Sequence, residues 1–282
     1  MFELRGKRAF RFFSAKEIKP TGWMRKQLET QAKSLSGCLD KIWPDIRDSK
    51  WIGGDGDGWE RLPYWLDGFM PLAYLLDDEE MIQRVEKYIT AILNQQQEDG
   101  WLCPCEKDER DRYDVWVFFL ISKVLVQYHQ HTGDERILPC LYKAWKMYDR
   151  HVDYITIINW GMMRWGEALI TLIWLYGQCK EEWILRLIKK IRAQGFDYAS
   201  FYQDPWHYAV RDEKGKWSQS SHVVNNAMAL KAGALYYLLT GDKYDLNLPA
   251  RMLEKLYKYH STVVGGFTGD ECFAGYRALR YG

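Results

Sequence analysis

The chain has 282 residues, and 47% of them are hydrophobic, enough to build a substantial core. Lys and Arg number 39 against 38 Asp and Glu, so the formal charge of +1 gives no electrostatic reason to expect a nucleic acid or an acidic membrane as a partner. The 14 Trp, 19 Tyr and 11 Phe exceed ordinary usage and suit either a Trp-rich helical core or a cleft whose rings stack on sugars.

The N-terminal stretch "MFELRGKRAFRFFSAKEIKP" carries charges throughout and lacks the apolar run of a signal peptide. No segment reaches the roughly 18 uninterrupted apolar residues that a membrane span needs. We therefore expect a cytoplasmic protein. The spacing of its six cysteines is not that of a small disulfide-rich domain. The C-x-C of "WLCPCEK" is not the C-x-x-C of zinc sites, so we expect free loop thiols there.

Helical periodicity dominates the chain. The stretch "MIQRVEKYITAILNQQ" (81–96) places its apolar residues on one stripe, whereas "DVWVFFLISKVLVQYHQH" (114–131) is apolar nearly all round. This alternation predicts outer helices and inner helices that are covered on both sides. The fold class that follows is all-α.

One junction recurs near residues 78, 134, 180 and 242: an apolar helix that ends in a turn with Gly or Asp, then an acidic helix start. The spacing averages about 55 residues, which fits one helical hairpin and its loop. Such hairpins must stack, either as an open superhelix or as a closed ring.

Long loops favour the closed ring, because their Gly, Asp and aromatic residues would crowd one mouth of a barrel. These loops are expected at 37–61, 99–112, 195–220 and 261–282. Six hairpins at this period need about 330 residues and about four to five are present here, so if the ring is six-fold, this chain forms an incomplete toroid.

Candidate binding residues lie at the starts of the expected inner helices, where charges stand among tryptophans. An isolated charge there usually forms an ion pair, but several at successive hairpin starts would converge on one funnel as substrate contacts. These candidates are Trp59, Glu60, Asp114, Trp116, Trp160 and Arg164.

A later segment, "WSQSSHVVNNAMALKAGALYY", places His222 at a helix start after a Ser-rich cap, with Asn225 one turn on. These residues are either a capping cluster or substrate contacts in which a neutral imidazole donates to a sugar hydroxyl. Near the end of the chain, Asp270 and Glu271 stand among glycines. They either cap a turn or form part of a site.

Six segments in order resemble the catalytic domain of β-L-arabinofuranosidase-like glycoside hydrolases. The segments are "KPTGWMRKQLETQAKSLSG", "WERLPYWLDGFMPLAYLLDDEEMI", "ILNQQQEDGWL", "YDVWV", "HVVNNAMALKAGALYYLLTGD" and "FTGDECFAG". The resemblance implies an (α/α)6 barrel over residues 15–282, after an N-terminal extension at 1–14, and retaining hydrolysis of L-arabinofuranosides or related plant-glycan sugars. It implies the acid/base role for Glu271 in G-D-E-x-x-x-G, with Asp270 beside it as a substrate contact.

The resemblance also implies a cysteine nucleophile on zinc, held by cysteines and a glutamate. The matching Glu/Cys stretch would begin at Gly282, so we expect no metal site and no cofactor in this chain, zinc only in a full-length relative, and no activity from the truncated chain. Cys272 is not assigned as the nucleophile, because relatives usually carry another residue there.

Two other functions fit the same features. One is another helical-toroid carbohydrate enzyme, an unsaturated uronyl hydrolase or a lyase, for which Asp114 is the candidate acid. The other is a non-catalytic sugar-binding or scaffold fragment. In each case the expected partner is a carbohydrate, with neither nucleic acid nor membrane involved, and a homo-oligomer is compatible with the sequence.

Overall fold

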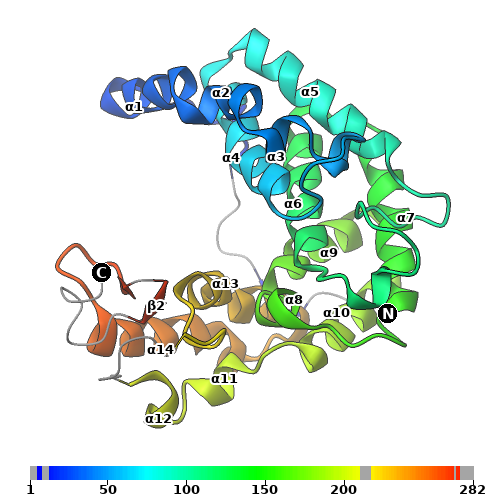
Figure 1. The fold of residues 1–282 in the computed structure, drawn as a ribbon. Helices are drawn as coiled ribbons and strands as arrows, with labels where there is room; N and C mark the ends of the chain where they lie inside the picture. Colours follow the sequence, from blue (N-terminus) through cyan, green and yellow to red (C-terminus); the bar gives the residue numbers. More distant parts are fainter. Residues whose placement is uncertain (1–4, 8–12, 210–216, 270, 274–282) are drawn as a thin grey trace. The chain divides into compact units, whose positions relative to one another are not determined.

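The computed structural model describes residues 5–7, 13–209, 217–269 and 271–273. These residues form helices and one short pair of strands (Figure 1). The chain divides into an N-terminal unit (Phe10–Thr156 with Gly177–Lys180) and a C-terminal unit (Met1–Ala9, Ile157–Tyr176 and Glu181–Gly282). Among the described helices, none combines the length and apolar content needed to cross a bilayer.

The N-terminal unit consists of helices joined by connections of different lengths, the longest of which lies between Asn94 and Trp116. Its elements are α1 (Gly22–Lys33), α2 (Leu35–Ile42), α3 (Pro44–Arg47), a 3-10 turn (Lys50–Ile52), α4 (Arg61–Leu76), α5 (Glu79–Asn94), a second 3-10 turn (Arg110–Arg112), α6 (Trp116–Thr132) and α7 (Ile137–His151). The pairs α4–α5 and α6–α7 are the first two helical hairpins, and α4 also packs against α6.

The recurring junctions are hairpin turns, as predicted. Each contains a residue in the left-handed region: Asp77 at φ 54°, Gly133 at φ 74°, Lys180 at φ 59° and Gly241 at φ 70°. This conformation ends a helix and lets the chain reverse. At two of these junctions an aspartate caps the next helix: Asp78 accepts a hydrogen bond of 3.0 Å from the Met81 amide at the start of α5, and Asp242 accepts one of 2.8 Å from the Tyr244 amide at the start of α14.

The predicted alternation of outer and inner helices is also confirmed within this unit. The buried residues of α5 form one stripe: Met81, Val85, Tyr88, Ile89 and Ile92. By contrast, α6 is buried on nearly every side, from Trp116 to His131. A helix with one apolar stripe covers a core, whereas one that is apolar all round lies within it.

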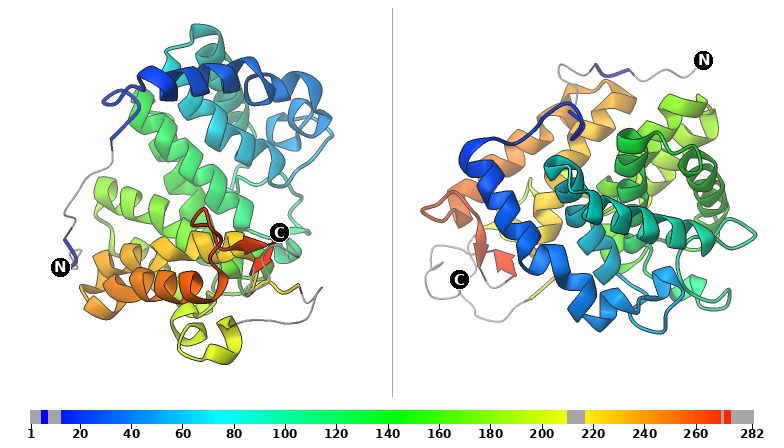
Figure 2. Two further views of the ribbon diagram at one scale, coloured as in Figure 1. Left: turned by 90° about the vertical axis from the view of Figure 1, so that its left-hand side faces the viewer. Right: turned by 90° about the horizontal axis from the view of Figure 1, so that it is seen from above.

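The C-terminal unit contains two further hairpins and a short strand pair. Its elements are α8 (Asn159–Met163), α9 (Gly166–Cys179, whose last three residues fall in the other unit), α10 (Glu182–Gln194), α11 (Tyr198–Phe201), α12 (Pro205–Tyr208), α13 (Val223–Thr240), α14 (Lys243–His260), β1 (Thr268–Gly269) and β2 (Cys272–Phe273). Helices α13 and α14 lie side by side in both views of Figure 2.

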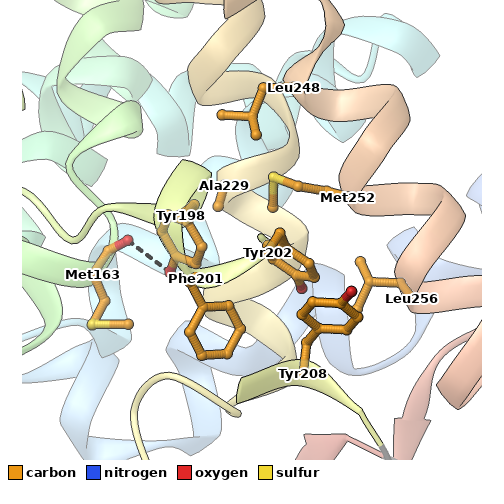
Figure 3. Packing of buried hydrophobic residues seen from close by; sticks show 9 residues of the cluster. All are labelled: Met163, Tyr198, Phe201, Tyr202, Tyr208, Ala229, Leu248, Met252 and Leu256. Carbon is orange, nitrogen blue, oxygen red and sulfur yellow. Dashed lines mark hydrogen bonds between the residues drawn. The ribbon is translucent and has the colours of Figure 1, made fainter. Parts of the chain in front are cut away.

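An aromatic and aliphatic cluster joins α8, α11, α12, α13 and α14 (Figure 3). Its buried members are Met163, Tyr198, Phe201, Tyr202, Tyr208, Ala229, Leu248, Met252 and Leu256. The Tyr198 hydroxyl donates to the carbonyl oxygen of Met163 at 3.1 Å, which ties α11 to the end of α8. The cluster thus fixes the short helices α11 and α12 against α13 and α14.

Two segments expected as loops contain short helices. Residues 37–61 include the end of α2 and all of α3, and residues 195–220 include α11 and α12. Pro44 and Pro205 stand in the first turn of α3 and α12, where the missing N–H costs nothing. Helices of four residues are too short to show a 3.6-residue period, which is why the pattern predicted loops.

Candidate active site

The first candidate cluster surrounds the start of α13 in the C-terminal unit. His222 is the N-cap residue of this helix, as predicted. Behind it, the fully buried Asn226 donates from Nδ2 to the carbonyl oxygens of Ser220 and His222, both at 2.9 Å, and accepts from the Tyr202 hydroxyl at 2.7 Å. These three bonds fix the turn that presents His222.

The His222 imidazole is held as a neutral donor. Its Nδ1 accepts from the Asn225 amide at 3.4 Å, so the proton of the neutral ring is on Nε2. Burial lowers the pKa of His222, the positive charge of Arg164 lowers it further, and Glu271 acts in the opposite direction. Within the described residues, Nδ1 makes the ring's one hydrogen bond, which leaves Nε2–H to donate.

Two indole rings pack around this imidazole. Trp160 meets it edge to face with ring centroids 5.0 Å apart, and Trp217 does so at 6.1 Å. The two tryptophans also contact each other, at 5.8 Å. Trp217 is 50% exposed, so much of its indole surface remains accessible to a ligand.

Arg164, in the short connection between α8 and α9, completes the cluster. Its guanidinium lies over the Trp160 ring, 4.5 Å from the centroid, and its Nε donates to Asn225 Oδ1 at 2.8 Å. Asn225 is itself anchored, since its Nδ2 donates to the carbonyl oxygen of Gln219 at 2.9 Å. Asn225 therefore joins the buried Arg164 to the turn that carries His222.

Glu271 reaches this cluster through the backbone. The carbonyl oxygen of Glu271 accepts from the Val223 amide at 2.8 Å, and the Phe273 amide donates to the carbonyl oxygen of Ser221 at 3.1 Å. Cys272 forms the isolated antiparallel bridge with His222 between these bonds. A residue 49 positions away in sequence is thus placed next to His222, while Asp270 lies outside the described residues.

The Glu271 side chain is exposed and its backbone is in the left-handed region, at φ 65°. A non-glycine residue adopts this conformation at an energetic cost, and such residues cluster at functional sites. An exposed carboxylate beside a neutral imidazole donor and two tryptophans can bind a sugar and exchange a proton with it.

A second cluster lies in the N-terminal unit. The Trp116 indole Nε1 donates to Glu60 Oε2 at 3.0 Å, and Asp114 caps the same helix by accepting from the Trp116 amide at 3.0 Å. Trp116 is fully buried, so its visible role is to hold Glu60. Trp59 donates its amide to Asp57 at 3.1 Å in the preceding loop.

The predicted residues therefore form two groups. Trp160, Arg164, His222, Asn225 and Glu271 meet in one unit, whereas Trp59, Glu60, Asp114 and Trp116 belong to the other. The convergence of both groups on one funnel stays a prediction. Sequence reasoning missed Trp217 and Tyr202; the position of Trp217 directly before the Ser-rich cap was the available signal.

The described residues do not fit a zinc site. Across residues 5–7, 13–209, 217–269 and 271–273, no three His, Cys, Asp or Glu side chains lie close enough to hold a metal ion. Burial raises the pKa of the Cys103 thiol well above its ordinary value and that of Cys105 to about 11, so neither is a ready thiolate. All six cysteines are free thiols.

Comparison with solved structures shows the fold. Over 90% of this chain, a GH127 beta-L-arabinofuranosidase from Geobacillus stearothermophilus T6 matches with a TM-score of 0.61 and 16% identity. A GH127 beta-arabinofuranosidase matches over 92% (TM-score 0.62, 11% identity), and a glycoside hydrolase over 89% (TM-score 0.60, 13% identity). The predicted all-α toroid of helical hairpins is thereby confirmed.

The chain spans less than half the length of these structures: 47%, 48% and 38%, respectively. A search of curated proteins finds no match. The family model described as "Beta-L-arabinofuranosidase, GH127 catalytic domain" matches residues 8–279, nearly the whole chain. The resemblance found in the sequence is confirmed, and the chain belongs to this family of glycoside hydrolases.

Proposed function

We propose that the chain contributes the acid/base half of the active site of a retaining glycoside hydrolase that acts on L-arabinofuranosides. The observation that carries this proposal is the pairing of the Glu271 segment with residues 221–223, next to His222, Trp160 and Trp217. Family membership supplies the reaction class, and two of the similar solved structures are of arabinofuranosidases.

Retaining hydrolysis needs one group that protonates the leaving oxygen and another that attacks the anomeric carbon. Glu271 is the proposed proton donor. Its carboxylate is exposed in the free protein, and a bound sugar would exclude water from it.

The surrounding residues would bind and orient the sugar. His222 Nε2–H would donate to a ring hydroxyl, while Trp160 and Trp217 would pack against the apolar faces of the sugar. Asn225 uses both its amide groups within the protein, so the role proposed for it is to hold Arg164 and the Gln219 carbonyl in place.

Trp59, Glu60, Asp114 and Asp270 remain proposed contributors to the substrate site, and the fully buried Trp116 would contribute by holding Glu60. Asp114 uses a carboxylate oxygen as a helix cap, which does not favour the uronyl hydrolase alternative. The group that attacks the anomeric carbon is not assigned to a described residue, and no step is derived through zinc. The cytoplasmic location also remains a proposal.

The test is hydrolysis of an aryl β-L-arabinofuranoside by the protein that contains this chain. Glu271→Gln should lower kcat by about 10²- to 10⁴-fold, the usual contribution of general acid–base catalysis. Glu254→Gln is the matched control, because Glu254 is an exposed carboxylate on α14 of the same unit, and it should retain full activity.

Two outcomes would contradict the proposal. One is a Glu271→Gln variant as active as the Glu254→Gln control. The other is measurable binding of arabinofuranosides without turnover by the unmodified protein, which would favour a sugar-binding role. Proton NMR of the first-formed product gives the stereochemistry, and retention of the anomeric configuration is expected.

A further inference from the structure

The β-hairpin that carries Glu271 is too short to hold itself in place. Strands β1 and β2 are two residues each, with Thr268 opposite Phe273 and Gly269 opposite Cys272. An isolated two-stranded hairpin is marginally stable at best in water. Two backbone hydrogen bonds to residues 221 and 223 add to it, but they carry no apolar burial.

The side-chain anchor is a stack between Phe273 and His260. The two rings are nearly parallel, at 18°, with centroids 4.4 Å apart. His260 is the last residue of α14 and is only 1% exposed. Its Nε2 faces the carbonyl oxygen of Tyr208, which only accepts, so Nε2–H donates and the ring is fixed.

The anchor also continues into the core cluster. The Phe273 ring lies 6.4 Å from that of Phe201, and Tyr208 stacks on Tyr202 at 5.4 Å. Tyr202 donates to Asn226, which fixes the turn of His222. Residues 271–273 and 221–223, which pair through these backbone bonds, therefore both rest on one aromatic cluster: the first segment through the ring stack, the second through Asn226.

We propose that Phe273 and His260 are positioning residues that hold the hairpin, and with it Glu271, against the start of α13. The expected effect on catalysis rests on the acid/base function proposed above for Glu271. The anchoring of the hairpin by Phe273 and His260 is independent of that function. Without the stack, the two backbone bonds would open more often, and the carboxyl would be in place for a smaller fraction of the time.

Amide hydrogen exchange tests the anchoring in the absence of any activity. In Phe273→Ala, the amides of residues 223 and 273 should exchange at least about tenfold faster, because a ring pair and its burial are lost. Phe196→Ala is the matched control, since the Phe196 ring contacts Tyr198 and Phe201 of the same cluster, and it should leave both amides unchanged. Phe273→Leu, which keeps most of the apolar volume, serves if the alanine variant does not fold.

The kinetic consequence is a loss that depends on the leaving group. Poor leaving groups need the proton from Glu271 more than activated aryl groups do. Phe273→Ala should therefore lower kcat more for an alkyl than for an activated aryl arabinofuranoside, with Phe273→Tyr restoring it. A merely destabilised enzyme would lose both activities equally.

The two proposals fail in different ways. If Glu271→Gln shows no dependence on the leaving group, the acid/base assignment is wrong, whatever Phe273→Ala does. The positioning role alone is overturned if the activity loss depends on the leaving group in Glu271→Gln but not in Phe273→Ala, and the amides of residues 223 and 273 in Phe273→Ala exchange at the rate of the unmodified protein.

Discussion

Replacement of Asn226 by alanine is the sharpest stability prediction for the C-terminal unit. The side chain is fully buried and makes three hydrogen bonds, two as donor to Ser220 and His222 and one as acceptor from Tyr202. Each is worth about 1 kcal/mol net, and the Tyr202 hydroxyl would be left buried without its acceptor. We expect the free energy of unfolding to fall by about 3 to 4 kcal/mol.

Urea unfolding followed by circular dichroism and tryptophan fluorescence measures this loss. Tyr202→Phe removes one of the three bonds and should cost about 1 to 2 kcal/mol. Gln203→Ala is the matched control: Gln203 is exposed and makes one bond, to the Tyr244 hydroxyl, so it should stay within about 0.5 kcal/mol. A loss below about 1 kcal/mol in Asn226→Ala would refute the view that this residue holds the turn.

Three further predictions concern other groups. Burial lowers the pKa of His131 and of His222, so these two side chains bind protons at a higher pH in the unfolded chain than in the folded one. The free energy of unfolding should therefore fall as the pH drops below about 6.5. Urea midpoints that stay constant down to about pH 5 would contradict this. Glu60→Ala should cost about 1 to 3 kcal/mol by removing the carboxylate that accepts from the buried Trp116 indole N–H, whereas Glu60→Gln keeps an acceptor there and should cost much less in thermal denaturation. Cys103, whose pKa is raised by burial, should resist iodoacetamide in the native protein and react after unfolding, as mass spectrometry can follow; rapid native labelling would contradict its burial.

Local features of the fold followed from the sequence because they depend on neighbouring residues. The turn at Gly241 and the helix start at Asp242 are adjacent, and both are visible as cap chemistry. The position of His222 at a helix start was predictable in the same way, from the serines before it. The 3.6-residue period of α5 and the apolar surface of α6 likewise indicated which helix is inner.

Long-range features did not follow, because the pattern carries no sign of which distant segments meet. Glu60 accepts from Trp116 across 56 positions, and Arg164 bonds Asn225 across 61. The pairing of the Glu271 segment with the turn before α13 depends on two backbone bonds and one ring stack, none of which has a periodic signature. Family resemblance, rather than periodicity, pointed to Glu271.

The account depends on Glu271 as the acid/base group, and azide rescue tests this most directly. The leaving group of an activated aryl β-L-arabinofuranoside departs without help from an acid, so the first step of the reaction proceeds in Glu271→Ala. The second step is slow in this variant, because the base that activates water is missing. Azide needs no base, so it should raise the turnover of this variant and yield an arabinofuranosyl azide of retained configuration. A variant that azide does not accelerate, or an azide product of inverted configuration, would contradict the account.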